Sequence, residues 1–254
     1  MNLEGKRILV TGSSRGIGRA IAIELAERGA ILVVHGARNS EPLDTAYAEV
    51  RRRSPDSIMA TAQLAESDAI ATLFDTIQTQ LGGLDALVNN AAAQNPSPLS
   101  DLAEQDWDFV MAVNLKAPML CAQHAVRLMR KNGHGGKIVN ISSVHAQAPR
   151  RNYAHYSSAK GGLEQLTRCM ALEFADFNIQ ANALTVGAIA TELTPADRQA
   201  AIATAIPAAR VGTVDEIARM TAFLCSNACD YLTGACITVD GGLTLGFCAN
   251  RRDL

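Results

Sequence analysis

The chain has 254 residues, of which 48% are hydrophobic and 19% are charged, and its formal net charge is −2. This composition excludes an intrinsically disordered chain, and the near-neutral charge excludes the basic patch that a nucleic acid or an anionic membrane surface would require of its partner. No apolar stretch approaches the roughly 18 residues of a membrane span, and the apolar run near the start is too short for a signal peptide, so we expect a cytoplasmic protein.

Short runs rich in β-branched residues alternate along the chain with longer segments of helical periodicity. Strands are predicted over residues 6–11, 31–35, 58–62, 84–88, 137–141, 179–184 and 235–239. Helices are predicted over 17–28, 42–53, 68–81, 105–131 with an interruption near Pro118, 156–174 and 215–225, with an inserted, mobile helical segment over 191–209. This order predicts an α/β fold, a doubly wound parallel seven-stranded sheet of the Rossmann type, in a single domain over residues 1–254.

A glycine-rich loop, TGSSRGIG over residues 11–18, lies between the first strand and the first helix. Gly12 permits a tight turn, Gly16 lets the backbone approach a pyrophosphate, and Gly18 allows close packing of the helix on the strand. Free N–H groups at the helix start would face that anion, unless this is an ordinary glycine-rich turn. The spacing Gly-x-x-x-Gly-x-Gly resembles that of the short-chain dehydrogenase/reductase family, which binds nicotinamide dinucleotides.

The residues after the second strand indicate which nicotinamide cofactor is bound. A carboxylate about 20 residues past the glycines would bind the ribose 2′-hydroxyl of NAD. Gly36 stands where NAD-selective members of the family carry an aspartate, and the first acid beyond it is Glu41. Arg15 and Arg38 would pair with the 2′-phosphate of NADP, unless both are merely solvated. We therefore expect NADP, with NAD as the less favoured cofactor.

Tyr156 and Lys160 are four residues apart at the start of a predicted helix, so they share one face. A neighbouring ammonium lowers the pKa of a tyrosine from about 10 toward the range of a general acid or base. The pairing alone is common, but Ser143 follows the fifth strand, residues 89–92 (NNAA) follow the fourth, and Asn114 lies in the preceding helical stretch. The carboxyl ends of strands form the ligand-binding edge of an open α/β sheet.

Together these residues resemble the short-chain dehydrogenase/reductase pattern over nearly the whole chain. The resemblance implies that Tyr156 exchanges a proton with the substrate hydroxyl, Lys160 tunes it, and Ser143 binds the reacting oxygen. It also implies that Asn114 holds a water of a proton relay and that Asn89 lines the cofactor edge. On the same resemblance, cofactor contacts are expected from Gly12, Ser14, Arg15, Gly16, Ile17, Gly18, Arg38, Gln63, Leu64, Asn90, Ala91, Tyr156, Lys160, Gly187, Ile189 and Thr191.

Three positions depart from the family pattern. Ala92 replaces a glycine, Val186 replaces the proline before Gly187, and Gln63 replaces an aspartate near the adenine. The missing proline should loosen the loop over the nicotinamide, whereas Gly187 keeps its backbone freedom. The Gln63 amide would still form a hydrogen bond, and none of the three positions carries a proton-transfer group.

Several segments resemble bacterial glucose 1-dehydrogenases and related aldose 1-dehydrogenases within the family, namely NAAAQNP (90–96), SSVH (142–145) and DGGLTL (240–245). The residues expected to bind substrate are Gln94, Ser143, His145 and Tyr156. Gln94 stands where the glucose enzymes usually carry a glutamate and supplies less acceptor charge. His145 would line the pocket or lie behind it. Arg150 and Arg151 would either receive an acidic substrate at the pocket mouth or lie solvated at a subunit interface.

We therefore expect an NADP(H)-dependent oxidoreductase that interconverts an alcohol or hemiacetal and a carbonyl, with an aldose oxidised at its anomeric carbon as the first expectation. The alternatives are a 3-oxoacyl thioester or general ketone reductase and, in another class, a non-catalytic NADP(H)-sensing protein. The resemblance implies a homotetramer in which the tail over 245–254 reaches a neighbouring pocket. Six cysteines are too few for a disulfide scaffold, and the five histidines show no ligand pair, so no metal site is expected.

Overall fold

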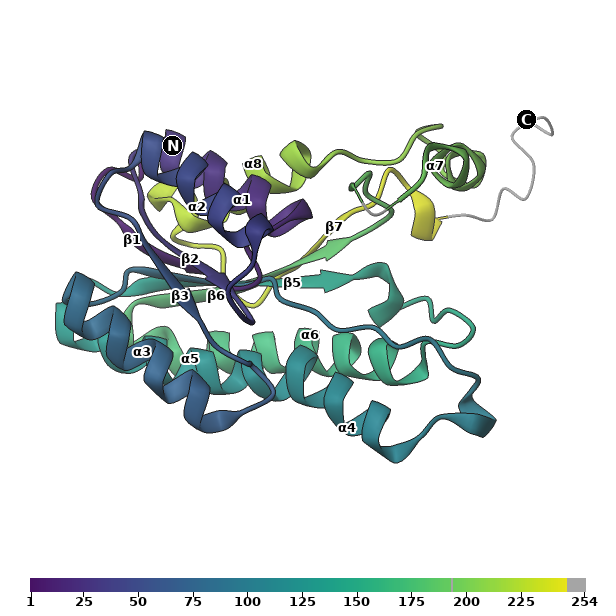
Figure 1. Cartoon of the computed structure of the whole chain (residues 1–254), viewed down its shortest axis with the longest axis horizontal. Coiled ribbons are helices and arrows are strands. Elements are labelled where there is room, and N and C mark those ends of the chain that lie inside the picture. The colour runs from purple at the N-terminus through teal and green to yellow at the C-terminus, as the bar shows by residue number, and fades with distance from the viewer. Residues whose placement is uncertain (193, 246–254) are drawn as a thin grey trace.

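A computed structural model describes residues 1–192 and 194–245, and a seven-stranded sheet runs through its centre (Figure 1). The strands are β1 (Arg7–Val10), β2 (Ile31–Gly36), β3 (Ile58–Thr61), β4 (Ala86–Asn89), β5 (Gly136–Ser143), β6 (Ile179–Val186) and β7 (Cys236–Val239). Their order across the sheet is β3-β2-β1-β4-β5-β6-β7, and all neighbouring strands are parallel. The strand order reverses between β1 and β4, which confirms the predicted doubly wound Rossmann-type fold.

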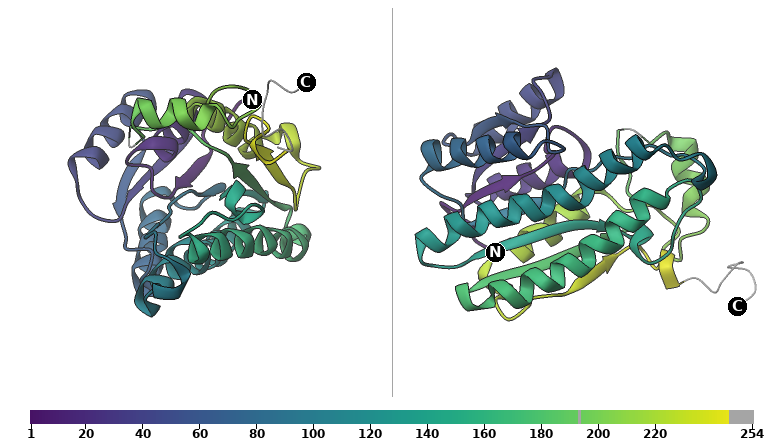
Figure 2. Two further views of the ribbon diagram at one scale, coloured as in Figure 1. Left: turned by 90° about the vertical axis from the view of Figure 1, so that its right-hand side faces the viewer. Right: turned by 90° about the horizontal axis from the view of Figure 1, so that it is seen from below.

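Helices cover both faces of this sheet (Figures 1 and 2). One face carries α1 (Gly16–Glu27), α2 (Glu41–Arg53) and α8 (Val214–Cys225), and the other carries α3 (Ser67–Leu81), α4 (Glu104–Met111), α5 (Ala117–Asn132) and α6 (Ala154–Phe174). Successive residues of a strand point to opposite faces, so Ile8 and Val10 pack in one core while Leu9 packs in the other. Burial on both faces explains why the strands are continuously apolar rather than alternating.

The long predicted helix over 105–131 is divided by a π-helical turn, Ala112–Lys116, between α4 and α5. Pro118 lies just beyond it, and because helical residues precede it without a break, its missing backbone N–H leaves one helical hydrogen bond unmade. The predicted interruption is therefore present, but it precedes the proline. The turn places Asn114 within the helix that faces the sheet.

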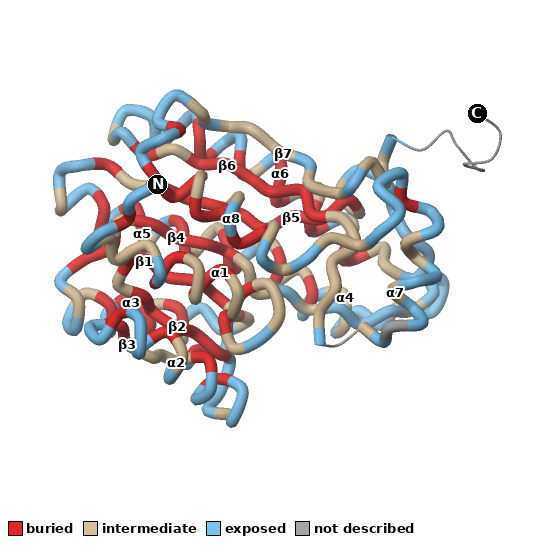
Figure 3. Tube along the Cα trace, turned by 90° about the horizontal axis from the view of Figure 1, so that it is seen from above, coloured by how far each residue is buried: buried red, intermediate tan, exposed pale blue. Residues whose placement is uncertain are grey.

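The carboxyl edge of the sheet carries the irregular segments. Figure 3 shows the buried trace following the strands, with largely exposed segments around α4 and α7 (Ala196–Ala203) beyond their carboxyl ends. The predicted helical segment over 191–209 is helical only in α7, because Pro195 precedes the helix and turns follow it. Residues 246–254 lie outside the described residues, and so does the expected role of the tail. No helix in residues 1–192 or 194–245 is both long and apolar enough to cross a membrane.

β5 and β6 each run two residues beyond the predicted ends, to Ser143 and Val186. Ser143 pairs in register with Val186 at the end of the β5–β6 ladder. Hydrogen bonding within the sheet therefore fixes the backbone of the serine that the sequence assigns to the reacting oxygen.

Candidate active site

The glycine loop between β1 and α1 has the backbone that its sequence predicts. Gly12 has a φ of +64° and Gly16 a φ of +54°, both in the left-handed region that favours glycine. A Cβ atom on Gly18 would lie 2.3 Å from both the Asn90 amide nitrogen and the Gly12 carbonyl oxygen. Arg15 precedes the helix without a side-chain cap, so the first amides of α1 remain available to an anion.

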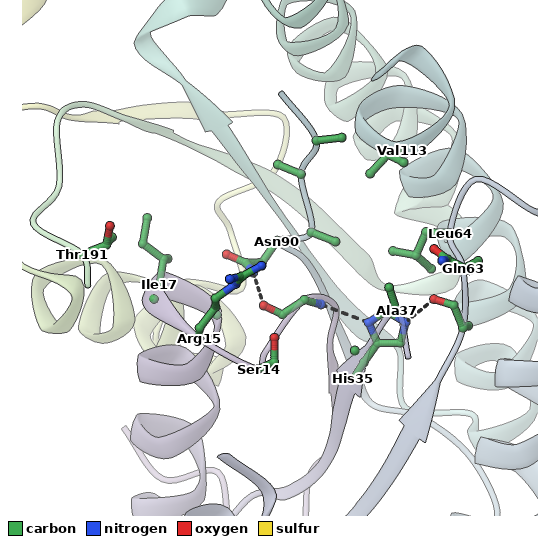
Figure 4. Close-up of a pocket in the computed structure, with 18 of the residues that line it drawn as sticks. Ser14, Arg15, Ile17, His35, Ala37, Gln63, Leu64, Asn90, Val113 and Thr191 are labelled. Atoms are coloured by element: carbon green, nitrogen blue, oxygen red, sulfur yellow. Dashed lines mark hydrogen bonds between the residues drawn. The ribbon is translucent and has the colours of Figure 1, made fainter. Parts of the chain in front are cut away.

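Side chains from two neighbouring strands hold this loop in place. The Asn90 side-chain amide donates to the carbonyl oxygens of Thr11, at 2.9 Å, and Gly12, at 3.0 Å. From β2, the Nδ1 atom of His35 accepts a hydrogen bond from the Gly12 backbone N–H at 3.1 Å (Figure 4). Its Nε2–H donates to the Ala62 carbonyl oxygen at 3.2 Å, so the ring joins the loop to the end of β3.

His35 is 1% exposed, and burial lowers its pKa to about 4. The ring is therefore neutral at pH 7, with the tautomer that leaves Nδ1 free to accept from Gly12. Sequence reasoning assigned no role to His35. The available signal was a titratable residue in an otherwise apolar buried strand, directly before the position that selects between the cofactors.

A cavity of about 400 Å³ runs along the loop and across the ends of β2 and β4 (Figure 4). The expected cofactor residues that line it are Gly12, Ser14, Arg15, Gly16, Ile17, Gly18, Gln63, Leu64, Asn90, Ala91 and Thr191. Gly36 and Ala37 also line it, whereas Arg38 is exposed and lies outside this lining. Within the described lining the one carboxylate is Glu192, which pairs with Arg19 at 3.4 Å. These features fit NADP. The loop amides and Arg15 would face its phosphates, and no acid at the end of β2 would repel the 2′-phosphate.

Asn89 does not reach this cavity. Its side chain is 4% exposed and donates to the Oδ1 atom of Asn140 on β5 at 2.8 Å. Asn89 therefore joins β4 to β5, and the expectation that it lines the cofactor edge is not met. The neighbouring Asn90 takes that place instead.

A second cavity of about 290 Å³ adjoins the first and shares Ile17, Asn90, Ala92 and Thr191 with it. Its lining brings together residues expected to act in catalysis, to bind substrate and to bind the cofactor. They are Gln94, Ser143, His145, Tyr156, Lys160, Gly187 and Ile189. The expected catalytic residue that lines neither cavity is Asn114. The cofactor cavity thus opens directly onto the space in front of Tyr156.

The hydroxyl of Tyr156 is the chemical centre of this second cavity. Burial is the largest influence on its pKa, and the neighbouring Ser143 and Gln94 side chains act in the opposite direction by favouring the ionised form. Because burial outweighs them, the pKa of Tyr156 is raised above its ordinary value. Tyr156 is therefore protonated at neutral pH in the structure, and the lowering expected from Lys160 together with a positively charged nicotinamide stays a prediction.

Lys160 lies near the Tyr156 ring, but its ammonium bonds to the backbone of β5. Its ammonium donates to the Ile141 carbonyl oxygen at 2.8 Å and lies 5.7 Å from the centroid of the Tyr156 ring. The side chain is buried, and burial lowers the pKa of Lys160 to about 8. The cation is thus shared with the backbone of β5 rather than directed only at the phenol.

Asn114 acts through the backbone around it. Its Nδ2 atom donates to the carbonyl oxygens of Ala93 and Val110, both at 2.9 Å, and its Oδ1 atom accepts from the Ala93 N–H at 3.3 Å. These bonds occupy both amide hydrogens of the side chain and tie the π-helical turn to the segment that carries Gln94. In the structure Asn114 positions the segment that carries Gln94, and the water of a proton relay expected at Asn114 stays a prediction.

His155 is a second positioning residue of the same segment. It is fully buried, and its Nε2–H donates to the Asn95 carbonyl oxygen at 2.9 Å. Asn95 follows Gln94, so this bond fixes the backbone next to a side chain that lines the same cavity as Tyr156. The sequence does not indicate which loop the His155 ring meets, so this contact emerges only from the structure.

The departures from the family pattern all border the two cavities. Ala92 lines both cavities, and Gln63 lines the cofactor cavity. The Gly187 N–H donates to the Val239 carbonyl oxygen at 3.0 Å, and a Cβ atom on Gly187 would lie 2.7 Å from Asp240 Cα. Gly187 is therefore required by the close approach of β7 even without the usual preceding proline. In the described part of the chain no three His, Cys, Asp or Glu side chains cluster as metal ligands do.

Comparison with known proteins gives consistent results. A family model described as enoyl-(acyl carrier protein) reductase matches residues 12–244. A glucose 1-dehydrogenase of Gluconobacter oxydans is 36% identical over 95% of this chain and 92% of its own length. A gluconate 5-dehydrogenase of the same organism is 36% identical over 96% of each chain. A 3-oxoacyl-(acyl-carrier-protein) reductase FabG of Staphylococcus aureus is 37% identical over 94% of this chain and 98% of its own.

Solved structures agree with these relatives. A gluconate 5-dehydrogenase of Burkholderia cenocepacia in complex with NADP and tartrate has a TM-score of 0.86 and 37% identity, over 96% of this chain and 97% of that one. An acetoin dehydrogenase of Enterobacter cloacae has a TM-score of 0.88 and 36% identity, over 98% of this chain and 100% of that one. These relatives share a fold and a reaction type, and their names give several different substrates.

Proposed function

The chain is an oxidoreductase of the short-chain dehydrogenase/reductase family, and from that premise we propose that it uses NADP(H) to interconvert a hydroxyl and a carbonyl on a sugar-class substrate. An aldose oxidised at its anomeric carbon is the first substrate to test. The observation that carries this proposal is the polar mouth of the catalytic cavity. Gln94, His145 and Tyr153 line it beside Ser143 and Tyr156, so hydroxyl groups find partners on several sides.

The residues around Tyr156 support acid–base chemistry on such a hydroxyl. The glycine loop and the cavity beside it would hold the dinucleotide, and a bound nicotinamide would supply the acceptor or donor of the hydride at the carbon that bears the hydroxyl. Tyr156 donates its phenolic proton to the carbonyl oxygen during reduction, and in the oxidation direction its ionised form receives the hydroxyl proton. Ser143 donates a hydrogen bond to the reacting oxygen, and Lys160 stabilises the charge that develops on the tyrosine.

The proposed cofactor is NADP rather than NAD. Gly36 and Ala37 line the cavity where a ribose-binding carboxylate would discourage a phosphate, and Arg15 lines it as a cation. Titration of the intact protein with NADPH and NADH should show tighter binding of NADPH. Arg15→Gln should weaken NADPH binding about tenfold or more while leaving NADH binding nearly unchanged. Equal binding of both cofactors would overturn this part of the proposal.

A 3-oxoacyl thioester reductase is the second candidate, because the FabG relative is as similar as the sugar enzymes. The cavity of about 290 Å³ favours a small substrate over a long acyl chain. A non-catalytic sensor on this fold is disfavoured because Tyr156, Lys160 and Ser143 all line one cavity.

An absorbance assay of NADPH formation separates these candidates. The protein would be mixed with NADP⁺ and a panel of D- and L-aldoses, aldonates, secondary alcohols and 3-hydroxyacyl thioesters. Turnover on sugars or sugar acids is the expected result. Turnover confined to thioesters would establish the second candidate, and NADPH binding without turnover on any substrate would favour the sensor.

We also propose that the chain acts as a homotetramer in the cytoplasm. Leu172 on α6 is 81% exposed, and Cys169 one turn before it is exposed as well. A second copy packed on this helix would cover both side chains. Sedimentation at micromolar concentration tests this, and a monomeric mass would contradict it.

A further inference from the structure

Arg150 stands at the mouth of the catalytic cavity, on the loop between β5 and α6. It lines the same cavity as Tyr156, Ser143 and Gln94. Its guanidinium carbon lies 4.7 Å from the centroid of the Tyr153 ring, a cation–π contact. The Tyr153 ring lies in turn 6.3 Å from the Tyr156 ring, edge to face. The loop thus carries a positive charge at a defined distance from the catalytic phenol.

The charge on Arg150 has no counter-ion within the described residues. No ion pair or side-chain hydrogen bond joins its guanidinium to residues 1–192 or 194–245, where its contact is the ring of Tyr153. A guanidinium stacked by one face on an aromatic ring keeps the N–H donors along its edge free. Those donors match the two oxygens of a carboxylate, which guanidinium groups bind in a fork.

The rest of the cavity favours an anion. Among its described lining residues the charged groups are Arg150 and Lys160, both cationic, and no Asp or Glu is present. Gln94 adds a neutral amide where a carboxylate would repel an acid. Glu192 lines only the cofactor cavity, where it is paired with Arg19.

His145 completes the polar wall next to Arg150. Its Nδ1 atom lies 3.1 Å from the Ala148 carbonyl oxygen, so Nδ1 carries the hydrogen and donates. In the neutral ring the Nε2 atom is then an acceptor, which suits a substrate hydroxyl rather than a second carboxylate. The ring centroids of His145 and Tyr153 lie 6.2 Å apart, so cation, rings and acceptor form one continuous surface.

We propose that Arg150 is a specificity-determining residue that binds a carboxylate of the substrate, and that among sugar-class substrates a polyhydroxy acid is therefore preferred over the neutral aldose. This inference rests on the proposed function, since it assigns the same cavity to the substrate. The carboxylate lies against Arg150 while Gln94 and His145 bind hydroxyls along the chain. The hydroxyl to be oxidised then lies at Tyr156 and Ser143.

The test compares two probes with the same carbon skeleton, D-gluconate and D-glucose, in steady-state turnover with NADP⁺. The variants are Arg150→Gln, Arg150→Lys and, as the matched control, Arg151→Gln, since Arg151 is exposed and lies outside the cavity lining. We expect gluconate to be the better substrate. Arg150→Gln should lower kcat/KM for gluconate by a factor of about 10 to 100, mainly through KM. Arg150→Lys should show a smaller loss of kcat/KM for gluconate than Arg150→Gln. In both variants, turnover of glucose should change less than threefold.

Each outcome bears on the inference separately from the proposed function. Preference for glucose with no effect of Arg150→Gln would leave the function standing and overturn the inference. If neither probe is turned over, calorimetric binding of gluconate to the NADPH-loaded protein decides the matter. Binding that weakens in Arg150→Gln but not in Arg151→Gln would support the inference, and equal or absent binding in both would overturn it.

Discussion

The Nδ1 atom of His35 accepts the backbone N–H of Gly12 at 3.1 Å, so a buried neutral ring holds the glycine at the start of the cofactor loop. Gly12 has a φ of +64° and no side chain of its own, so only its backbone groups can anchor it. The bond from His35 and the one from Asn90 define the loop on two sides. Protonation of His35 would convert its Nδ1 from an acceptor to a donor and break this arrangement.

His35 should make stability depend on pH in the acid range. Its pKa is lowered from 6.5 to about 4, so the unfolded chain binds this proton more tightly than the folded chain. The stabilisation that the neutral His35 ring gives is fully present above pH 6.5. As the pH falls to about 4, the free energy of unfolding should decrease by up to about 3 kcal/mol. His35→Asn removes the titration and keeps an acceptor. Urea unfolding at pH 7 and pH 4 should show a smaller pH effect in His35→Asn, with exposed His134→Asn unchanged as the control. An identical pH effect in all three proteins would contradict this account.

Lys160 should cost stability while serving catalysis. Burial lowers its pKa from 10.5 to about 8, so the unfolded chain binds this proton more tightly than the folded chain. Below pH 8 the charged, buried ammonium therefore reduces the free energy of unfolding. The penalty is present below pH 8 and disappears above pH 10.5. Lys160→Met should raise the free energy of unfolding at pH 7 by about 2 kcal/mol, after the loss of the bond to Ile141 is subtracted. Turnover should fall at least 100-fold. Chemical denaturation checks the first result, and a destabilised variant would refute it.

Gly18 and Gly161 offer a matched pair of glycine-to-alanine changes. A Cβ atom on Gly18 would lie 2.3 Å from Asn90 Nδ2 and Gly12 O, whereas one on Gly161 would meet only Ala146 O at 3.6 Å. Gly18→Ala should disrupt the loop and lower NADPH affinity more than tenfold. Gly161→Ala lies inside α6 and should stabilise the chain by roughly 0.5–1 kcal/mol. Fluorescence titration compares the NADPH affinities of the two variants, and urea unfolding measures the stability gain of Gly161→Ala. Equal affinities would show that the loop tolerates the added methyl group.

His155 should affect the substrate more than the cofactor, because its Nε2–H fixes the backbone at Asn95. His155→Phe removes that donor and should raise KM for the substrate about tenfold, with NADPH affinity changed less than twofold. His155→Gln restores a donor and should recover part of the loss. A parallel loss of substrate and NADPH affinity would instead indicate a general structural defect.

The sequence predicted the doubly wound parallel sheet and most of the residues that line the two cavities for one physical reason. Parallel strands end at a common edge, so residues that follow apolar runs, such as Asn90 and Ser143, converge there whatever their distance along the chain. Tyr156 and Lys160 followed from helical spacing in the same way. The expected pairing of Arg38 with a phosphate was less secure, since the direction of an exposed side chain after a strand depends on the turn.

Other features depend on tertiary contacts that no local pattern contains. Asn89 and Asn90 are adjacent and identical, yet one turns into the sheet and the other to the loop, because alternation at the end of β4 sends them to opposite sides. Asn114 occupies a π-helical turn, whose position is determined by its bonds to Ala93 and Val110. Burial raises the pKa of Tyr156, and the Lys160 ammonium bonds to the Ile141 carbonyl oxygen, a contact that helical spacing alone does not indicate.

The most direct test of the account is turnover by Tyr156→Phe beside Tyr231→Phe, a fully exposed and distant control. NADPH formation would be followed with the best substrate of the panel, together with NADPH binding and thermal unfolding. Loss of the phenol should lower kcat by a factor of at least about 100 while NADPH binding and unfolding temperature stay close to those of the unaltered chain. Tyr231→Phe should retain full turnover. Undiminished turnover by Tyr156→Phe would contradict the assignment of Tyr156 as the proton donor and acceptor.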